Sequence, residues 1–279
     1  MSDRAVKDLL DLKGRVAIIT GGAGLLGRRH GAALAEFGAI PVLLDIDTAR
    51  AEAAAKEITG NHGVAALGLA ADITSVAALA EVKKSVMAKF GRIDILINNA
   101  ANNPKMEDSG LSSEWTRLEN FPLKVWNDDI AVGLTGAMLC AQLFGAEMAR
   151  AGKGVILNVA SDLGVIGPDQ RIYRKGGVAD DGQPVKPVTY SVVKSGLIGL
   201  TRYLATYWAD RGVRANALLP GGVENGQDPA FVARLTNLIP MGRMARPDEY
   251  KAAVLFLVSD ASSYMTGATL SVDGGRTAW

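Results

Sequence analysis

A glycine-rich turn joins an apolar run to an Ala/Leu-rich segment near the start of the chain. The residues read Val16-Ala-Ile-Ile-Thr-Gly-Gly-Ala-Gly-Leu-Leu-Gly27, and a second apolar run ends at Asp45. Glycines between a strand and a helix allow a tight bend and let the backbone approach a pyrophosphate, which the N-terminus of the helix attracts through its N–H groups and its dipole. The pattern therefore predicts a turn that binds a dinucleotide.

Apolar runs and helical patterns alternate along the rest of the chain. Seven runs are typical of buried parallel strands: Val16–Thr20, Ile40–Asp45, Ala65–Ala70, Ile93–Asn98, Gly154–Val159, Arg214–Leu219 and Thr269–Val272. Helical spacing is found in Leu25–Phe37, Thr48–Thr59, Val76–Phe90, Val125–Arg150, Thr189–Arg211 and Pro247–Ser259. We expect an α/β fold, a Rossmann-like doubly wound parallel sheet of about seven strands with helices on both faces.

The composition is that of one globular domain. The 279 residues are 48% hydrophobic, without a Pro/Ser-rich linker, so the chain can bury a large core without disulfides. The one cysteine, Cys140, supports neither a disulfide nor a metal site. We expect a single domain over residues 1–279, with residues 1–13 as an N-terminal extension and residues 162–188 as an insertion.

Charge and hydropathy exclude several kinds of partner. The formal net charge is only +1, so we expect no binding to nucleic acid or to an anionic membrane. The first residues lack the apolar core of a signal peptide, and we expect no uninterrupted apolar segment of membrane-spanning length. These observations predict a cytoplasmic protein.

Polar residues and turns follow the predicted strands on the side where the strands end. They are Gly21, Asp45, Asp72, Asn98, Ser161 and Pro220. Doubly wound sheets bind their ligands beyond the carboxyl ends of the strands. The residues therefore converge on one edge, where we expect the functional site.

Tyr190 and Lys194 lie four residues apart in the predicted helix Thr189–Arg211, so their side chains share one face. A cation beside a phenol favours the phenolate, and this pairing predicts that Tyr190 exchanges protons near neutral pH. A solvated pair on the helix surface is the alternative for these two residues alone.

Several short motifs occur in a fixed order along nearly the whole chain. They are the glycine turn, Asp72-Ile73, Asn98-Asn-Ala-Ala101, Ser161, Tyr190 with Lys194, Pro220-Gly221 and Val272-Asp-Gly-Gly275. In this order they resemble the compact, single-domain branch of the short-chain dehydrogenase/reductase family. The resemblance implies hydride transfer between a nicotinamide cofactor and a secondary alcohol or ketone. Ser161, Tyr190 and Lys194 would be catalytic, with Ser161 and Tyr190 also binding the substrate.

The same resemblance implies a set of cofactor contacts: Gly21, Gly24, Leu26, Gly27, Asp45, Ile46, Asp72, Ile73, Asn99, Tyr190, Lys194 and Val223. Asp45 would accept hydrogen bonds from the ribose hydroxyls and repel a 2′-phosphate, which favours NAD over NADP. With two histidines and one cysteine in the chain, we expect no metal.

The chain departs from the family pattern at three positions. Leu25 stands where the glycine turn usually has a glycine, and Asn225 replaces a threonine after Pro220-Gly221. Gly133 replaces the asparagine that supports a water-borne proton relay in the family. Our hypothesis is that Gly133 loosens its helix and leaves a backbone carbonyl for a water.

The segment between Ser161 and Tyr190 is longer than in close relatives, and we expect it to cover the site. Its charged residues favour a polar or anionic substrate, with Arg171 and Arg174 as predicted substrate contacts, although a solvated surface loop is an equal alternative. Asn102–Leu123 is a candidate second lid. The pattern also resembles relatives linked to surface-sugar biosynthesis and flagellin modification, which implies a sugar-like substrate.

Two other functions stay open at this stage. One is a sugar epimerase or dehydratase, which the glycine spacing favours, and the other is a nucleotide-binding regulatory protein without turnover. The resemblance further implies a homo-oligomer, a dimer or a tetramer, with Val125–Arg150 and Gly267–Trp279 as the predicted interfaces.

Overall fold

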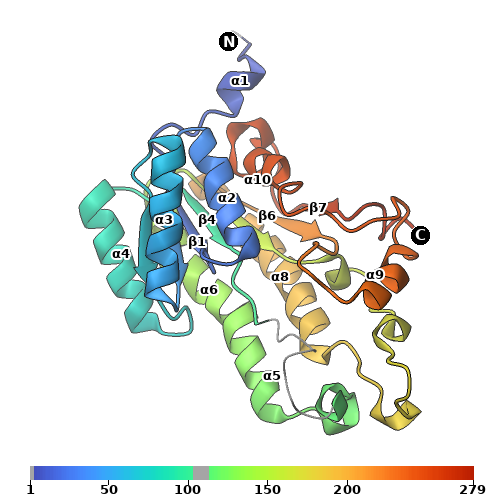
Figure 1. Ribbon diagram of the computed structural model, residues 1–279. Coiled ribbons are helices and arrows are strands. Elements are labelled where there is room, and N and C mark those ends of the chain that lie inside the picture. The colour runs from blue at the N-terminus through green and yellow to red at the C-terminus, as the bar shows by residue number, and fades with distance from the viewer. Residues whose placement is uncertain (1–2, 103–112) are drawn as a thin grey trace.

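Seven parallel strands form one sheet in the order β3-β2-β1-β4-β5-β6-β7 (Figure 1). The computed structural model describes residues 3–102 and 113–279. The strands are β1 (Val16–Thr20), β2 (Ile40–Asp45), β3 (Leu67–Ala70), β4 (Ile95–Asn98), β5 (Gly154–Val159), β6 (Val213–Pro220) and β7 (Thr269–Val272). The order reverses between β1 and β4, which is the place where doubly wound sheets bind ligands. The predicted Rossmann-like fold is confirmed.

The strand boundaries differ from the predicted ones in three places. β3 and β4 begin two residues later than predicted, at Leu67 and Ile95. β3 is an edge strand that pairs only with β2, which limits its length. β6 is longer by one residue at each end, because Val213 pairs with the first residue of β5 and Pro220 with the last residue of β7.

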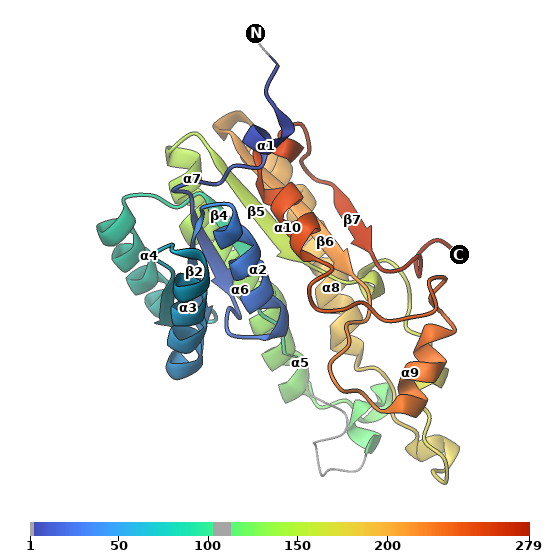
Figure 2. The ribbon, with the colours of Figure 1, turned by 45° about the horizontal axis from the view of Figure 1, so that its top comes forward.

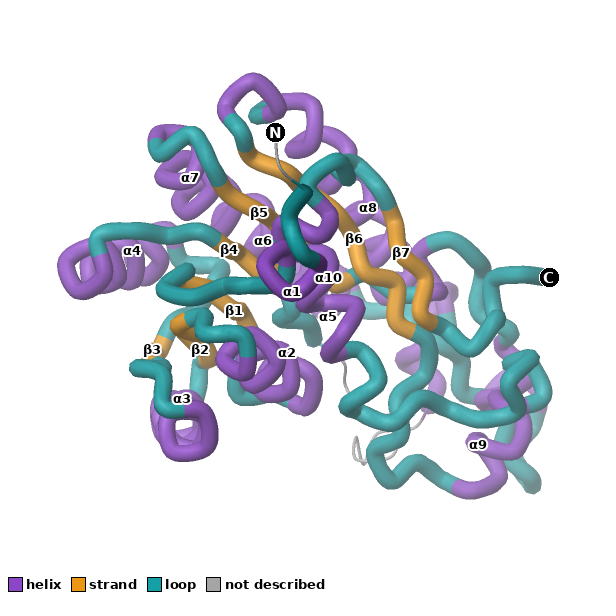
Figure 3. The backbone as a smooth tube through the Cα atoms, turned by 90° about the horizontal axis from the view of Figure 1, so that it is seen from above, coloured by secondary structure: helices purple, strands orange, loops and turns teal. Residues whose placement is uncertain are grey.

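Helices cover both faces of the sheet (Figures 2 and 3). On one face lie α2 (Leu25–Glu36), α3 (Thr48–His62) and α10 (Lys251–Val258). On the other lie α4 (Val76–Phe90), the helical segment 123–150 and α8 (Val188–Tyr207). Two short helices, α1 (Val6–Leu9) and α9 (Pro229–Thr236), escape the sequence analysis because four or eight residues carry little periodicity.

Helix ends follow the expected chemistry. Asp47 accepts the Arg50 N–H at the start of α3 (3.0 Å) and so satisfies a donor that has no partner within the helix. Gly91, Gly152 and Gly212 have φ angles of 69°, 70° and 67°, in the left-handed region that glycine adopts without strain. Each of these glycines follows the end of a helical segment, as is typical of glycines that end helices.

The helical segment 123–150 alternates between two kinds of helix. It runs through α5 (Leu123–Ile130), a π-helix (Ala131–Thr135), α6 (Gly136–Cys140), a second π-helix (Ala141–Gly145) and α7 (Ala146–Arg150). By length and composition this segment passes as a membrane span, so the expectation that no segment reaches that length is wrong. Cys140, Phe144 and Met148 are nevertheless fully buried against the sheet, as in a core helix.

His30 is buried in α2 without a hydrogen-bond partner for either ring nitrogen. Burial lowers the pKa of its imidazole from 6.5 to about 4. The unfolded chain therefore binds a proton between pH 6.5 and 4 that the folded protein does not bind. Linkage then makes the protein less stable as pH falls through this window.

Replacing His30 with leucine should remove much of this acid sensitivity. In the wild type we expect His30 to cost about 2 kcal/mol of unfolding free energy between pH 7 and pH 5, and this part of the loss should disappear in His30→Leu. Urea unfolding of both proteins at the two pH values measures the difference. Equal losses in the two proteins would show that His30 does not carry the effect.

Candidate active site

The glycine turn packs too closely to admit side chains. A Cβ at Gly27 would lie 2.3 Å from the Gly21 carbonyl oxygen, and one at Gly22 would lie 2.8 Å from the Cα of Leu43. α2 begins immediately after Gly24, with no side chain capping its first N–H groups. The turn therefore leaves the helix N-terminus open to an anion, and it fits the pyrophosphate of a dinucleotide.

Two side chains tie the glycine turn to the neighbouring strands. The Asp45 carboxylate, at the end of β2, accepts the N–H groups of Ala23 (3.2 Å) and Asp47 (3.3 Å). The Asn99 amide, just past β4, donates to the carbonyl oxygens of Thr20 (3.0 Å) and Gly21 (3.2 Å). Both residues thus lie at the edge where the sequence places the cofactor site.

The remaining predicted cofactor contacts surround the same edge in different states of burial. Ile73 is buried, and Ile46 is 80% exposed. The Asp72 carboxylate accepts the hydroxyl (2.7 Å) and N–H (2.8 Å) of Thr74, and these bonds lower its pKa. The Val223 carbonyl accepts the Gln227 side-chain amide at 2.7 Å. Their contacts with a cofactor stay a prediction.

The three predicted catalytic residues come together at the carboxyl end of β5. Tyr190 and Lys194 lie on the first turns of α8, and Ser161 follows β5. The Tyr190 hydroxyl donates to the Ser161 hydroxyl oxygen at 3.4 Å, and the Lys194 ammonium donates to the Val159 carbonyl at 2.8 Å. The alternative of a solvated Tyr-Lys pair is wrong, because Lys194 is buried.

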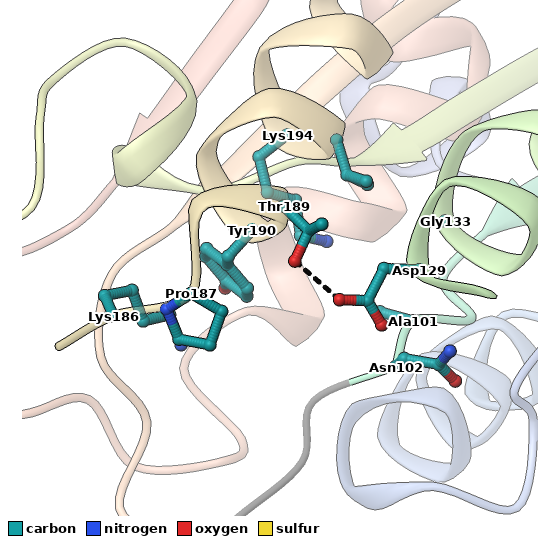
Figure 4. A pocket seen from close by; sticks show the side chains of 10 residues that line it. Ala101, Asn102, Asp129, Gly133, Lys186, Pro187, Thr189, Tyr190 and Lys194 are labelled. Atoms are coloured by element: carbon teal, nitrogen blue, oxygen red, sulfur yellow. Dashed lines mark hydrogen bonds between the residues drawn. The ribbon is translucent and has the colours of Figure 1, made fainter. Parts of the chain in front are cut away.

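A small pocket opens beside Tyr190 between α5 and α8 (Figure 4). Figure 4 shows Thr189, Tyr190 and Lys194 on α8, with Asp129 of α5 facing them. The Thr189 hydroxyl donates to the Asp129 carboxylate at 2.5 Å, which joins the two helices across the pocket. The lining residues are Ala101, Asn102, Asp129, Gly133, Lys186, Pro187, Thr189, Tyr190, Val193 and Lys194.

Electrostatics in this pocket differ from the sequence-based prediction. Burial raises the pKa of Tyr190, against a smaller lowering by its hydrogen bond with Ser161. The net direction of the Tyr190 pKa is therefore opposite to the predicted lowering by Lys194. Burial also lowers the pKa of Lys194 to about 8, helped by the positive charge of Lys186.

Sequence reasoning missed Lys186 as a site residue. Its ammonium lies 3.8 Å from the centre of the Tyr190 ring, and burial lowers its pKa to about 8. It precedes Tyr190 by four residues, the spacing that singled out Lys194 on the other side. The signal was hidden because α8 begins only at Val188, so Lys186 belongs to the end of the insertion.

The structure places the two predicted substrate arginines away from this pocket. Arg171 pairs with Asp169 at 2.6 Å and its side chain is 81% exposed. Arg174 is 61% exposed, faces Asp180 at 3.6 Å and lines a separate cavity with Phe231 of α9. Neither lines the Tyr190 pocket. Their role in substrate binding stays a prediction.

The insertion has an internal order of its own. The Gln183 side chain accepts the Lys175 N–H (2.8 Å) and donates to the carbonyls of Lys175 (3.1 Å) and Val178 (2.6 Å). The Arg117 guanidinium donates to the Asp180 carbonyl at 3.1 Å, so the insertion contacts the second predicted lid. Residues 103–112 of that lid lie outside the described residues.

Comparisons with known proteins agree over almost the whole chain. A family model described as enoyl-(acyl carrier protein) reductase matches residues 23–277. D-threitol dehydrogenase of Mycolicibacterium smegmatis is 35% identical over 271 residues, which cover 95% of this chain and 94% of that protein. A solved short-chain type dehydrogenase/reductase from Mycobacterium marinum superposes with a TM-score of 0.84 at 29% identity, over 98% of this chain and 99% of the other.

The chain belongs to the short-chain dehydrogenase/reductase family. It is an oxidoreductase that acts on CH–OH groups with a nicotinamide cofactor. A second solved relative, a gluconate 5-dehydrogenase from Burkholderia cenocepacia in complex with NADP and tartrate, has a TM-score of 0.85 and 29% identity, over 99% of this chain and 100% of the other.

Gly133 departs from the family pattern for a reason that the structure makes visible. It lies in the first π-helix, Ala131–Thr135, where the helix is wider than an α-helix, and the backbone carbonyl left for a water stays a prediction. A Cβ at this position would lie only 2.5 Å from Cγ1 of Val193 on α8. Because Val193 lies between Tyr190 and Lys194, Gly133 lets the catalytic helix pack closely against the π-helix.

Residues 3–102 and 113–279 contain no cluster of metal-ligating side chains. Nowhere in these ranges do three or more histidine, cysteine, aspartate or glutamate side chains gather in a way that could hold a metal ion.

Proposed function

We propose that this enzyme is an NAD-dependent dehydrogenase of a small polyhydroxylated substrate, a polyol or sugar acid. The main support for this proposal is the contact between Tyr190 and Ser161, which lies beside Lys194 at the carboxyl end of β5. The relatives support the substrate class, because one is a threitol dehydrogenase and another is a gluconate dehydrogenase with bound tartrate.

The residues of the chain have distinct parts in the proposed reaction. Tyr190 takes the proton of the substrate hydroxyl during oxidation and returns it during reduction. Ser161 binds the reacting oxygen, and the positive charge of Lys194 stabilises the tyrosinate that forms. The glycine turn would hold the pyrophosphate of the cofactor, and Asp45 would accept hydrogen bonds from the adenosine ribose. The nicotinamide supplies or accepts the hydride when bound.

The pocket chemistry suits a substrate with several hydroxyl groups. Asp129 accepts hydrogen bonds and Lys186 donates them, and both line the pocket near Tyr190. A steroid or a long acyl chain has few groups that could form hydrogen bonds with this polar lining. A polyol or aldonate instead offers a hydroxyl or carboxylate to each of them.

The test is a turnover assay across substrate classes. The change in NADH or NADPH absorbance is followed with tetritols, pentitols, hexitols, aldonates, nucleotide sugars and apolar ketones. We expect the highest kcat/KM with a polyol or aldonate. Good turnover only with apolar ketones or acyl thioesters would overturn the proposed substrate class.

Asp45 is the basis for proposing NAD over NADP. One finding weighs against it, because the gluconate dehydrogenase relative holds NADP. A second complication is Arg50 of α3, whose guanidinium donates to the Ala23 carbonyl at 3.3 Å, beside Asp45. A cation at this point would attract a 2′-phosphate once the carboxylate is removed.

We therefore expect Asp45→Ser to shift the kcat/KM ratio toward NADP by at least about tenfold. Arg50→Ala in the same background should reverse much of the gain, since it removes the cation that meets the phosphate. Steady-state kinetics with both cofactors measure the ratio in the wild type and the two variants. An unchanged ratio in Asp45→Ser would rule out this carboxylate as the selecting group.

We propose further that the chain is one domain, with residues 162–188 as an insertion, and that it works as a cytoplasmic homo-oligomer. The predicted interfaces, residues 125–150 and 267–279, expose the apolar side chains of Met138 and Trp279. Subunit contacts at these two segments would bury both side chains. Sedimentation equilibrium measures the mass of the assembly.

A further inference from the structure

A buried ion pair adjoins the catalytic serine. Asp162 directly follows Ser161, and its carboxylate lies 3.0 Å from Nε of Arg276. The two side chains are only 8% and 5% exposed. Burying two charges costs free energy unless they are well paired. A buried ion pair is therefore weak evidence that the pair stabilises the fold. The position of this pair beside the catalytic serine therefore suggests a role other than stabilising the fold.

The C-terminal segment is shaped to deliver Arg276 to this place. Gly274 and Gly275 have φ angles of 66° and 89°, which other residues rarely adopt. The Asp273 carboxylate accepts the N–H groups of Gly275 (3.0 Å) and Thr277 (2.9 Å) and so closes a tight turn around Arg276. The predicted Val272–Gly275 motif thus positions an arginine.

The ion pair connects to Tyr190 through a chain of hydrogen bonds. The Tyr190 hydroxyl donates to Ser161 (3.4 Å), and the Ser161 hydroxyl donates to the Asp162 carboxylate (2.7 Å). The Leu163 N–H donates to both Ser161 (3.2 Å) and Asp162 (2.8 Å) and holds the two side chains in register. The charged pair therefore stands two hydrogen bonds from the catalytic phenol.

We propose that Asp162 and Arg276 are a pair of positioning residues that aims the Ser161 hydroxyl and sets the proton affinity of Tyr190. This inference rests on the proposed function only in taking Tyr190 as the acid and base. The carboxylate orients the serine proton, and the guanidinium offsets the negative charge that the carboxylate places near the phenol.

The charges act in opposite directions. The largest influence on the pKa of Tyr190 is burial, which raises it; the Ser161 hydrogen bond lowers it, and the charge of Asp162 raises it. Burial also raises the pKa of the neighbouring Tyr173. The charge of Arg276 lowers this pKa, and the charge of Asp162 raises it. Removing Asp162 should therefore lower the pKa of Tyr190, and removing Arg276 should raise it.

Other charged and titratable groups also face this cluster. Lys186 and Lys194 lie at 3.8 and 5.7 Å from the centre of the Tyr190 ring. Asp129 reaches the pocket through Thr189. The charge of Asp162 also raises the pKa of Tyr173 and that of Tyr250, which burial raises most. All of these groups stay in place in the variants below, so a difference between variants reports on the ion pair.

The experiment compares pH profiles of alcohol oxidation, in which turnover rises with pH as Tyr190 loses its proton. We expect Asp162→Asn to move the midpoint to lower pH and Arg276→Met to move it to higher pH, each by about one unit. The double variant should return toward the wild-type midpoint. Arg276→Lys, which keeps the charge, should stay near the wild type.

A matched control removes another ion pair, which lies at the amino ends of the strands. Asp260 pairs with Arg15 at 2.8 Å before β1, far from Tyr190 along the strands. Asp260→Asn should leave the midpoint unchanged. Shifts of the same sign in Asp162→Asn and Arg276→Met, or no shift in either, would overturn the proposal, because a merely structural pair lowers turnover without moving the profile.

A second measurement needs no turnover and covers variants that lose activity. The ultraviolet absorbance of tyrosinate is titrated in each protein, and the curve of the same protein carrying Tyr190→Phe is subtracted, so that the difference belongs to Tyr190. We expect the same opposite shifts. If the wild type reduces or oxidises none of the tested substrates, the proposed function fails, and this titration still decides the role of the ion pair.

Discussion

Tyr190→Phe should lower kcat by about a thousandfold while the enzyme stays folded. Phenylalanine keeps the ring that packs beside Lys186 and Pro187, so cofactor affinity and melting temperature should change little. The lost hydroxyl is the group that exchanges the proton with the substrate and contacts Ser161. The measurement is kcat with the best substrate of the panel, together with NADH binding by fluorescence.

A matched control tests whether the loss belongs to this hydroxyl. Tyr203 lies further along the same helix and is 60% exposed, so Tyr203→Phe removes the same atom from α8 without touching the pocket. Its kcat should match that of the wild type. Turnover of Tyr190→Phe within a fewfold of the wild type would remove Tyr190 from the chemistry and revive the reading as a regulatory nucleotide-binding protein.

Residues at strand ends and on helix faces were predictable because their placement follows from local periodicity. Ser161 follows a buried run that forms β5, and Tyr190 and Lys194 share a face of α8 at i and i+4 spacing. A parallel sheet then brings the strand ends to one edge whatever the loops do. The fold and the catalytic residues thus depend on few long-range details.

The groups missed by the sequence analysis depend on long-range placement. Arg276 reaches Asp162 only because β7 lies beside β6 and the chain then turns back over the site. Lys186 reaches Tyr190 from an insertion without regular periodicity. In the same insertion, composition drew attention to Arg171 and Arg174, yet both are mostly exposed, because a short-range partner holds each one at the surface.

The direction of the Tyr190 pKa could not be read from the sequence for a related reason. Spacing shows that Lys194 is near, but it does not show how much water the fold removes from the phenol. Burial disfavours the charged form of tyrosine and of lysine alike, and here it is the largest influence on the pKa of both Tyr190 and Lys194. Charge partners can be predicted from motifs, whereas desolvation depends on the packed structure.

Gly133→Asn should damage the enzyme rather than restore a family residue. The added Cβ would meet Cγ1 of Val193 at 2.5 Å, and Val193 is β-branched and buried on α8, so it has little freedom to turn away. We expect a loss of about 1–3 kcal/mol in unfolding free energy from overpacking. Displacing α8 should also move Tyr190 and lower kcat by about a hundredfold.

Val193→Ala provides the matched test, because it removes the atoms that the new side chain would meet. Alone it should cost stability through the cavity that it leaves. Combined with Gly133→Asn, it should recover much of both the stability and the turnover, a coupling that a double-mutant cycle measures. If Gly133→Asn instead raises turnover severalfold, the glycine does not serve packing, and the proton relay of this enzyme is impaired by its absence of asparagine.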